Sequence, residues 1–308
     1  SESGGPHLHS PEYMKKALLD RYGTRYAILT GQTGPIAGMP DPDYQAAICR
    51  AWNDYTISKW LPSDERFRMG IQLPIADPQL AAAEIERLGD HPGVVCGLIA
   101  GTASRIPLGQ RFYWPIYEAA QRKNLTIHFH PSTTSVIANL GSTAAGMASS
   151  YLESHACLPQ FYQAYVASFI FEGVFEKFPG LRVALIEGGV SWLVHLMWRM
   201  DKEFKALRQQ APFLKRLPSE YIKDHIRLGT QPMEEPKKKE HMLQIFDMID
   251  AEHTLMYASD YPHFDFDEPV VLPKGISDTT RQRILHDNAC EFFNLPPLPE
   301  VKIEEDAA

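Results

Sequence analysis

The chain reads Leu255-Met256-Tyr257-Ala258-Ser259-Asp260-Tyr261-Pro262-His263 at a point where a short apolar run stops at a carboxylate and passes into a turn. Continuous apolar runs are typical of strands that are buried on both faces of a parallel sheet. In folds of alternating strands and helices, the residue just past the carboxyl end of a strand faces the catalytic crevice. We therefore predict a strand over 255–259 and a chemical role for Asp260.

The same pattern occurs twice upstream. The run Leu125-Thr126-Ile127-His128-Phe129-His130 ends in His130 before a proline, and a second run over 181–186 ends in Glu187 before two glycines. The carboxyl ends of parallel strands meet at one edge of a sheet. These run ends therefore predict that His130, Glu187 and Asp260 converge on one site.

Strand-like runs alternate with helix-like segments along the whole chain, as in βα units around a parallel sheet. The predicted strands are 25–30, 67–73, 94–100, 125–130, 182–187, 226–230 and 255–259, and the predicted helices are 43–60, 78–88, 113–123, 161–177, 192–207, 240–248 and 278–293. Asp43 and Asp77 are expected to cap the first two helices. The pattern fits one α/β domain over 1–308, a (β/α)8 TIM barrel without its first strand and with an insertion at about 132–160. A doubly wound open sheet is the alternative.

Bulk properties exclude several classes of protein. The net charge of -8 provides none of the basic surface that nucleic-acid binding requires. No apolar run reaches the roughly 20 residues that span a bilayer, so no membrane contact is expected. The cysteines form no close pair, which favours reduced thiols in a cytoplasmic protein. They are Cys49, Cys96, Cys157 and Cys290.

The chain also resembles a known family. His130-Pro131, the glycines after Glu187, Ser259-Asp260-Tyr261-Pro262 and the closing Asp287-Asn288-Ala289 are similar to motifs of the amidohydrolase-related family. This branch of the amidohydrolase superfamily includes metal-dependent decarboxylases of small carboxylic acids. The resemblance implies a barrel in which His130 binds a divalent metal ion and Asp260 binds the ion or activates its water. The expected ion is Zn, Mn or Fe.

The sequence departs from the family pattern at the first strand. In the family this strand carries a His-X-His pair of metal ligands, but no strand is predicted before Arg25. The segment His7-Leu8-His9 has the right spacing, yet Gly4-Gly5-Pro6 and Ser10-Pro11 on either side are loop residues. The pair either replaces the missing ligands or belongs to an exposed loop. The start at Ser1, without Met, is typical of a piece from within a longer polypeptide.

Glu187 is the second departure, because relatives often have a histidine at this position. A carboxylate is a hard oxygen ligand and would serve as metal ligand or base. The two following glycines are expected to leave the backbone open to a ligand. The structural alternative is an ion pair with an arginine such as Arg199. With Glu187 as a ligand, the set also suits iron or a two-metal centre.

Other candidate residues lie in loops. His155 falls in the long insertion, and loops of that length are usually lids or binding segments. It is expected over the site as acid, base or extra ligand, or else at the surface. Gln231 and His263 follow predicted strands and are expected to orient a substrate carboxylate. His128 is predicted to point away from His130, between the barrel and its helices.

These observations predict a metal-dependent hydrolase or decarboxylase (carboxy-lyase) acting on a small carboxylic acid or a related substrate, with Asp260 and His155 as proton-transfer groups. Two alternatives stay open: an iron-dependent or two-metal oxygenase on the same barrel, and a non-catalytic subunit paired with a homologous enzyme. A homodimer, or a heteromer with a homologous chain, is expected because the predicted helices 161–177 and 192–207 are rich in aromatic side chains. These are Phe161, Tyr162, Tyr165, Phe169, Phe171, Phe175, Trp192 and Trp198.

Overall fold

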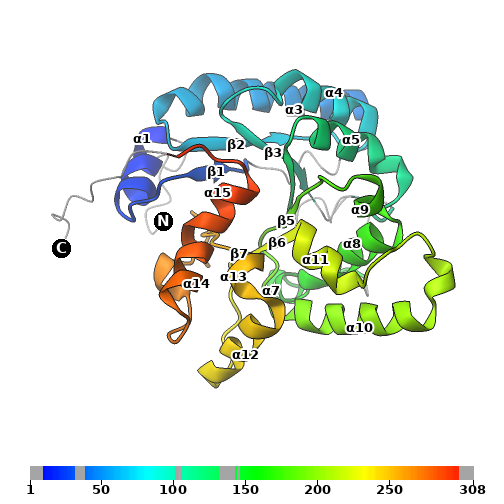
Figure 1. Ribbon diagram of the computed structural model, residues 1–308. Helices are drawn as coiled ribbons and strands as arrows, with labels where there is room; N and C mark the ends of the chain where they lie inside the picture. Colours follow the sequence, from blue (N-terminus) through cyan, green and yellow to red (C-terminus); the bar gives the residue numbers. More distant parts are fainter. Residues whose placement is uncertain are drawn as a thin grey trace.

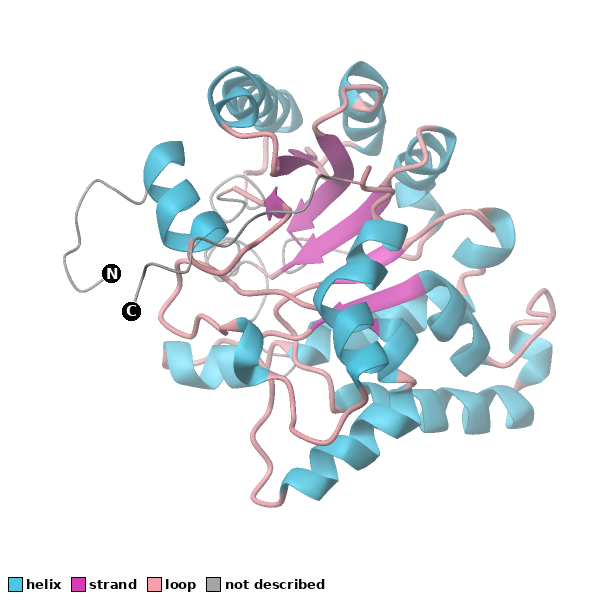
Figure 2. Ribbon diagram, turned by 60° about the vertical axis from the view of Figure 1, so that its left-hand side comes forward, coloured by secondary structure: helices cyan, strands magenta, loops and turns pink. Residues whose placement is uncertain are grey.

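The computed structural model describes residues 10–31, 39–100, 104, 106–131, 143 and 146–297. In this part of the chain, seven strands form one parallel sheet in which each strand is hydrogen-bonded to the next along the sequence. The strands are β1 (Ala27–Leu29), β2 (Phe67–Gln72), β3 (Val94–Ala100), β4 (Thr126–His130), β5 (Val183–Leu185), β6 (Ile226–Gly229) and β7 (Leu255–Met256). The sheet curls, and the helices lie outside it (Figures 1 and 2). Because the strand order never reverses, the doubly wound alternative is excluded.

Every predicted strand is present, and most are shorter than predicted at one or both ends. All six residues of β2 are buried, as expected for a strand covered on both faces. The prediction of seven strands in a barrel-like parallel arrangement is therefore confirmed. The absence of a first strand is not settled, and His7 and His9 lie outside the described residues.

Helices connect the strands. They are α1 (Pro11–Met14), α3 (Pro42–Tyr55), α4 (Pro78–Leu88), α5 (Trp114–Arg122), α7 (Tyr151–Ala156), α8 (Pro159–Phe171), α9 (Val174–Lys177), α10 (Trp192–Ala206), α11 (Pro218–His225), α12 (Lys239–Ile249), α13 (Ala251–Thr254), α14 (Asp278–Gln282) and α15 (Asn288–Phe292). The Asp77 carboxylate caps α4 by accepting from the backbone N–H groups of Gln79 and Leu80. The predicted cap of α3 was wrong: Asp41 caps it, and Asp43 lies within its first turn.

The aromatic side chains that suggested an interface are mostly core residues. Tyr162, Tyr165, Phe169, Phe175 and Trp192 are buried between the sheet and helices α8 to α10. The stated reason for expecting an oligomer was therefore wrong for these five residues. Trp198 on α10 is 61% exposed, so it is the clear exception. Oligomerisation stays a prediction.

Two further expectations concern the cysteines and membranes. All four cysteines lie in the described part of the chain and are free. Among the described residues, no helix combines the length and the apolar character that a membrane crossing requires.

The curled sheet is open on one side. Within the described residues, β1 and β7 are the two ends of the sheet and are not hydrogen-bonded to each other. We call this opening the seam. A cavity of about 630 Å³ lies along it, lined by residues of β1, β7, α1 and α15 and by His128 and His130 from β4.

A buried ion pair fixes the chain near the seam. The Arg66 guanidinium donates to both carboxylate oxygens of Asp64 at 2.9 Å and to Asp20 at 2.7 Å. The Asp64 side chain is only 6% exposed. Hydrogen bonds from Arg66 hold the pKa of the Asp64 carboxyl well below its usual range. The pair connects the start of β2 to the helical turn that follows α1.

We expect Asp64→Asn to lower the free energy of unfolding by about 1–3 kcal/mol at pH 7, because charged hydrogen bonds to a buried guanidinium are lost. The folded-state pKa of Asp64 is depressed, so its stabilisation is present above the unfolded-state pKa and is lost as the pH falls. The difference in the free energy of unfolding between wild type and Asp64→Asn should therefore shrink below about pH 4. Urea unfolding across this pH range would measure it.

The matched control is Asp90→Asn, which removes the same charge from a side chain that is 82% exposed and pairs with Lys123. Its effect should be small at every pH, because exposed ion pairs contribute little. If the loss of unfolding free energy in Asp64→Asn, relative to wild type, grows as the pH falls, the prediction is contradicted.

Candidate functional site

Three strand ends deliver metal-binding side chains to one place. His130 ends β4, Glu187 follows β5, and Asp260 lies in the loop after β7. One ligand atom from each of them lies within 4.8 Å of the others. His130 Nε2 and Glu187 Oε2 are 3.0 Å apart, and the Glu187 side chain is only 7% exposed. We call this group the metal-ligand cluster.

Tyr162 from α8 holds two of these strand ends together. Its hydroxyl donates to the carbonyl oxygen of Ile186, which precedes Glu187, and lies 3.3 Å from the carbonyl oxygen of Phe129, which precedes His130. A Cβ atom at position 188 would overlap the Tyr162 ring, so this glycine is required by packing. The expectation that the glycines leave space for a ligand was therefore wrong at Gly188.

The backbone turns sharply at both carboxylates. Glu187 has a φ of 63° and Asp260 a φ of 57°. Both lie in the left-handed region of backbone conformation, which residues other than glycine rarely adopt. Such conformations cost on the order of 1–3 kcal/mol each and concentrate at functional sites. Two of the five non-glycine residues with positive φ in the described chain are the carboxylates of the metal-ligand cluster.

His130 has its ring fixed in the orientation of a metal ligand. Its Nδ1 lies 2.7 Å from the carbonyl oxygen of Pro131. The carbonyl can only accept, so Nδ1 carries the proton and donates it, and Nε2 faces Glu187. Ligating histidines commonly use this arrangement, in which a backbone carbonyl fixes the tautomer and leaves the other nitrogen for the ion.

Asp260 is held through one of its two oxygens. Its Oδ2 lies 3.2 Å from Gln231 Nε2, which donates to it, and 3.0 Å from His263 Nδ1. The Asp260 carboxylate raises the pKa of His263. Gln231 was expected to orient a substrate carboxylate, but its side chain is fully buried and also donates to Asp265 Oδ2 at 3.0 Å. Among the predicted substrate-binding residues, His263 is the more accessible.

His155 reaches the cluster from α7. Its Nε2 lies 3.5 Å from Glu187 Oε1 and 3.6 Å from Asp265 Oδ2. Glu187 raises the pKa of the His155 imidazole. Asp265 was not predicted, although the acidic run Asp265, Asp267 and Glu268 just after the Asp260 motif was an available signal.

The prediction for His128 was wrong. Both His128 and His130 line the cavity along the seam. Residues two apart in a strand share a face, and this period should have placed the two histidines together. Burial lowers the pKa of His128 to about 3, so its ring is neutral.

The residues of this site fit a divalent metal ion. Among the described residues, the buried side-chain atoms without a hydrogen-bond partner include Glu187 Oε2 and Gln231 Oε1. Buried polar atoms normally have partners, so orphans that gather at one place indicate a ligand. One imidazole and two carboxylates form a donor set that suits Zn, Mn or Fe. The alternative partner of Glu187, Arg199, pairs instead with Glu203 on α10.

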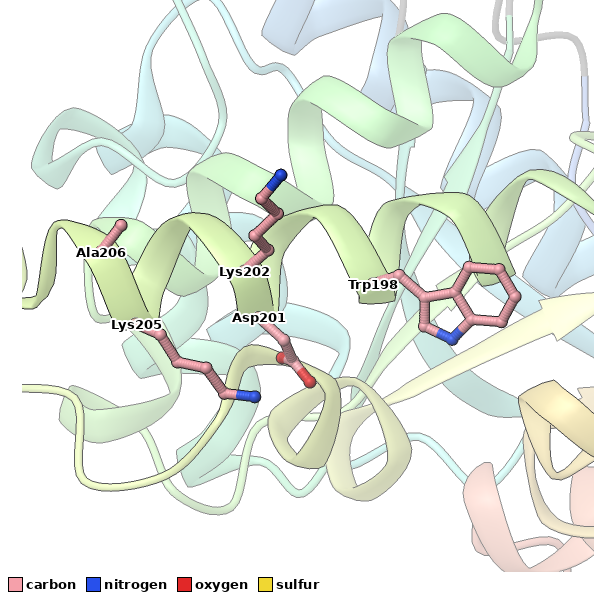
Figure 3. A pocket seen from close by; sticks show the side chains of 5 residues that line it. All are labelled: Trp198, Asp201, Lys202, Lys205 and Ala206. Atoms are coloured by element: carbon pink, nitrogen blue, oxygen red, sulfur yellow. The ribbon is translucent and has the colours of Figure 1, made fainter.

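A second hollow lies on the surface of α10 and does not form such a site. It has a volume of about 570 Å³ and is lined by Trp198, Asp201, Lys202, Lys205 and Ala206. Figure 3 shows that all five side chains come from this one helix. Its functional groups do not converge from separate elements, in contrast to the metal-ligand cluster.

The chain is similar to known proteins over most of its length. The family model described as amidohydrolase matches residues 6–295. The gamma-resorcylate decarboxylase of Polaromonas sp. is 25% identical over 294 residues, which are 90% of this chain and 86% of that relative.

Solved structures show the same fold. A dihydroxybenzoic acid decarboxylase from Polaromonas sp., with bound manganese and the inhibitor 2-nitroresorcinol, has a TM-score of 0.72 and 23% identity, covering 91% of this chain and 85% of that one. The 5-carboxyvanillate decarboxylase from Sphingomonas paucimobilis has a TM-score of 0.69 and 22% identity. The match covers 92% of this chain and 82% of that one. At these identities the similarity establishes the barrel-type fold.

Proposed function

This chain belongs to the amidohydrolase family, and on that premise we propose that it is a metal-dependent decarboxylase of a small aromatic carboxylic acid. The observation that carries the proposal is the convergence of His130, Glu187 and Asp260 at the carboxyl ends of the strands. The names of its relatives favour a carboxy-lyase over a hydrolase. The oxygenase and the non-catalytic subunit gain no support from those relatives.

In this proposal His130 Nε2, Glu187 and Asp260 hold a divalent cation, and the manganese of a structural neighbour makes Mn a suitable first choice. When bound, the cation would bind the substrate's carboxylate and stabilise negative charge on an adjacent oxygen. Gln231 and His263 position the Asp260 carboxylate for this role by donating to its Oδ2.

His155 supplies the proton. Loss of carbon dioxide leaves an electron pair on the ring carbon, which must then accept a proton. His155 Nε2 faces carboxylate oxygens of Glu187 and Asp265, and two acceptors favour the tautomer that carries a proton on this nitrogen. The side chain is 16% exposed, so its proton exchanges with solvent.

Isotope incorporation tests the reaction type. In deuterated water, the product of gamma-resorcylate should carry one solvent deuteron on the carbon that lost its carboxylate, because the proton comes from an exchangeable side chain. Mass spectrometry and proton NMR of the product measure this directly.

Reaction in water labelled with heavy oxygen is the matched experiment. A decarboxylase places no solvent oxygen in the aromatic product, whereas hydrolysis of a test amide or ester would place one there. Strict dependence of turnover on dioxygen would overturn the proposal in favour of an oxygenase.

We also propose that the full barrel is one domain with an eighth strand in the seam. The sequential order from β1 to β7, the unpaired edges of these two strands in the described residues, and the cavity between them support this proposal. A strand in this place would bring further side chains next to the metal-ligand cluster, where the family resemblance implies a His-X-His pair.

A further inference from the structure

Two exposed aromatic side chains lie beside the metal-ligand cluster. Phe264 follows His263 in the loop after β7 and is 81% exposed, and Tyr151 on α7 is 50% exposed. Their ring centroids are 6.1 Å apart with an edge-to-face angle of 71°. Burial of an apolar side chain stabilises a fold, so the exposed Phe264 contributes little to the stability of this one.

His155 connects these rings to the metal-ligand cluster. The Tyr151 ring stacks on the His155 imidazole at 5.2 Å and 28°, and Phe264 lies 6.2 Å from the same imidazole. His155 Nε2 in turn lies 3.5 Å from Glu187. The pKa of Tyr151 is raised by partial burial and by the charges of Glu187, Asp265 and Asp260, which is consistent with a position near these carboxylates.

Local hydrogen bonds hold Tyr151 in place without using its ring. Ser150 caps α7 by accepting from the backbone N–H of Glu153, and the Glu153 carboxylate accepts from the backbone N–H and hydroxyl of Ser149. A capped helix therefore presents the ring of Tyr151 beside His155, and the loop that also carries Asp260 presents Phe264.

We propose that Tyr151 and Phe264 form an aromatic clamp that stacks on the ring of an aromatic carboxylic acid while the acid's carboxylate faces the metal-ligand cluster. This inference rests on the proposed function and adds to it the residues that determine substrate specificity. Aromatic rings prefer edge-to-face or offset contacts at centroid separations of about 4.5–7 Å. Tyr151 and Phe264 already have such a contact with each other, and Phe264 keeps most of its surface free for a third ring.

Two alternative roles predict different outcomes. If the rings only packed α7 onto the loop after β7, their replacement would change stability and leave ligand preference unchanged. If the substrate ring instead entered the cavity along the seam, Phe264 would have no effect on binding, because Phe264 does not line that cavity.

The test compares benzoate with cyclohexanecarboxylate, which has the same charge and a similar size but no aromatic face. Isothermal titration calorimetry of manganese-loaded protein gives both dissociation constants without turnover. The wild type should prefer benzoate. Phe264→Leu and Tyr151→Leu keep an apolar side chain but lose the aromatic face, so this preference should fall about three- to tenfold in each. Binding of cyclohexanecarboxylate should stay unchanged.

The matched control is Phe213→Leu, which changes an exposed phenylalanine in the segment after α10. It should leave the preference for benzoate unchanged. A preference that survives in both clamp variants, or wild-type protein that binds neither acid, overturns the inference. A preference that depends on Phe264 in a protein that decarboxylates nothing would refute the proposed function and leave the clamp in place.

Discussion

Replacement of Asp260 by asparagine should lower kcat about 10²- to 10⁴-fold, the range for loss of a group that acts directly on the reaction. Asparagine keeps the shape of the side chain, so Gln231 and His263 can still contact it. It removes the negative charge that holds the cation and its bound substrate. Asp260 lies in a loop after β7 and contributes little to the apolar core, so the melting temperature should change little. Steady-state kinetics and thermal unfolding measure the two effects.

Asp224→Asn is the matched control for this substitution. The Asp224 side chain is 54% exposed and pairs with Arg216. Asp224→Asn therefore removes the same charge from an exposed ion pair outside the metal-ligand cluster. It should leave kcat unchanged. An Asp260→Asn variant that is folded and fully active would remove Asp260 from the reaction.

The second large effect is expected on metal binding. Glu187→Gln should weaken the affinity for manganese at least about 100-fold, because outer-shell changes alone cost 10- to 100-fold and Glu187 is proposed as a direct ligand. The metal-free variant should be no less stable than wild type, since the substitution removes a buried carboxylate close to Asp260 and Asp265. Metal analysis after dialysis and competition with a chelator give the affinity.

Glu203→Gln serves as the control, because Glu203 pairs with Arg199 on the outer face of α10. Its manganese affinity should match that of the wild type. If Glu187→Gln retains manganese as tightly as the wild type, Glu187 is not a ligand, and His130 and Asp260 alone cannot account for the site.

The strands could be predicted because each is a short run rich in apolar residues with a clear end. The helix α4 was predicted with its bounds, since Asp77-Pro78 and Gly89 mark its two ends. Helices α7 and α11 were missed because they are short, with six and eight residues, and show few repeats of an apolar period. Local pattern is therefore informative where an element is long or fully buried.

The residues of the site likewise fall into those that the sequence could predict and those that it could not. His130, Glu187 and Asp260 could be brought together from the sequence because strand ends in a parallel sheet share an edge. Tyr151 and Phe264 could not, because they lie in a short helix and a loop whose positions depend on contacts with His155. No sequence period specifies such contacts.

The left-handed backbone at Glu187 and Asp260 has a consequence for how this chain can change over evolution. At both positions glycine would adopt the same φ without steric cost, so the fold alone favours glycine by about 1 kcal/mol or more at each. Improving stability and keeping the site are thus opposed at these two positions. In a duplicated gene that is no longer selected for catalysis, Glu187 and Asp260 should be replaced early. A variant selected for thermostability without an activity assay should likewise lose these two carboxylates first.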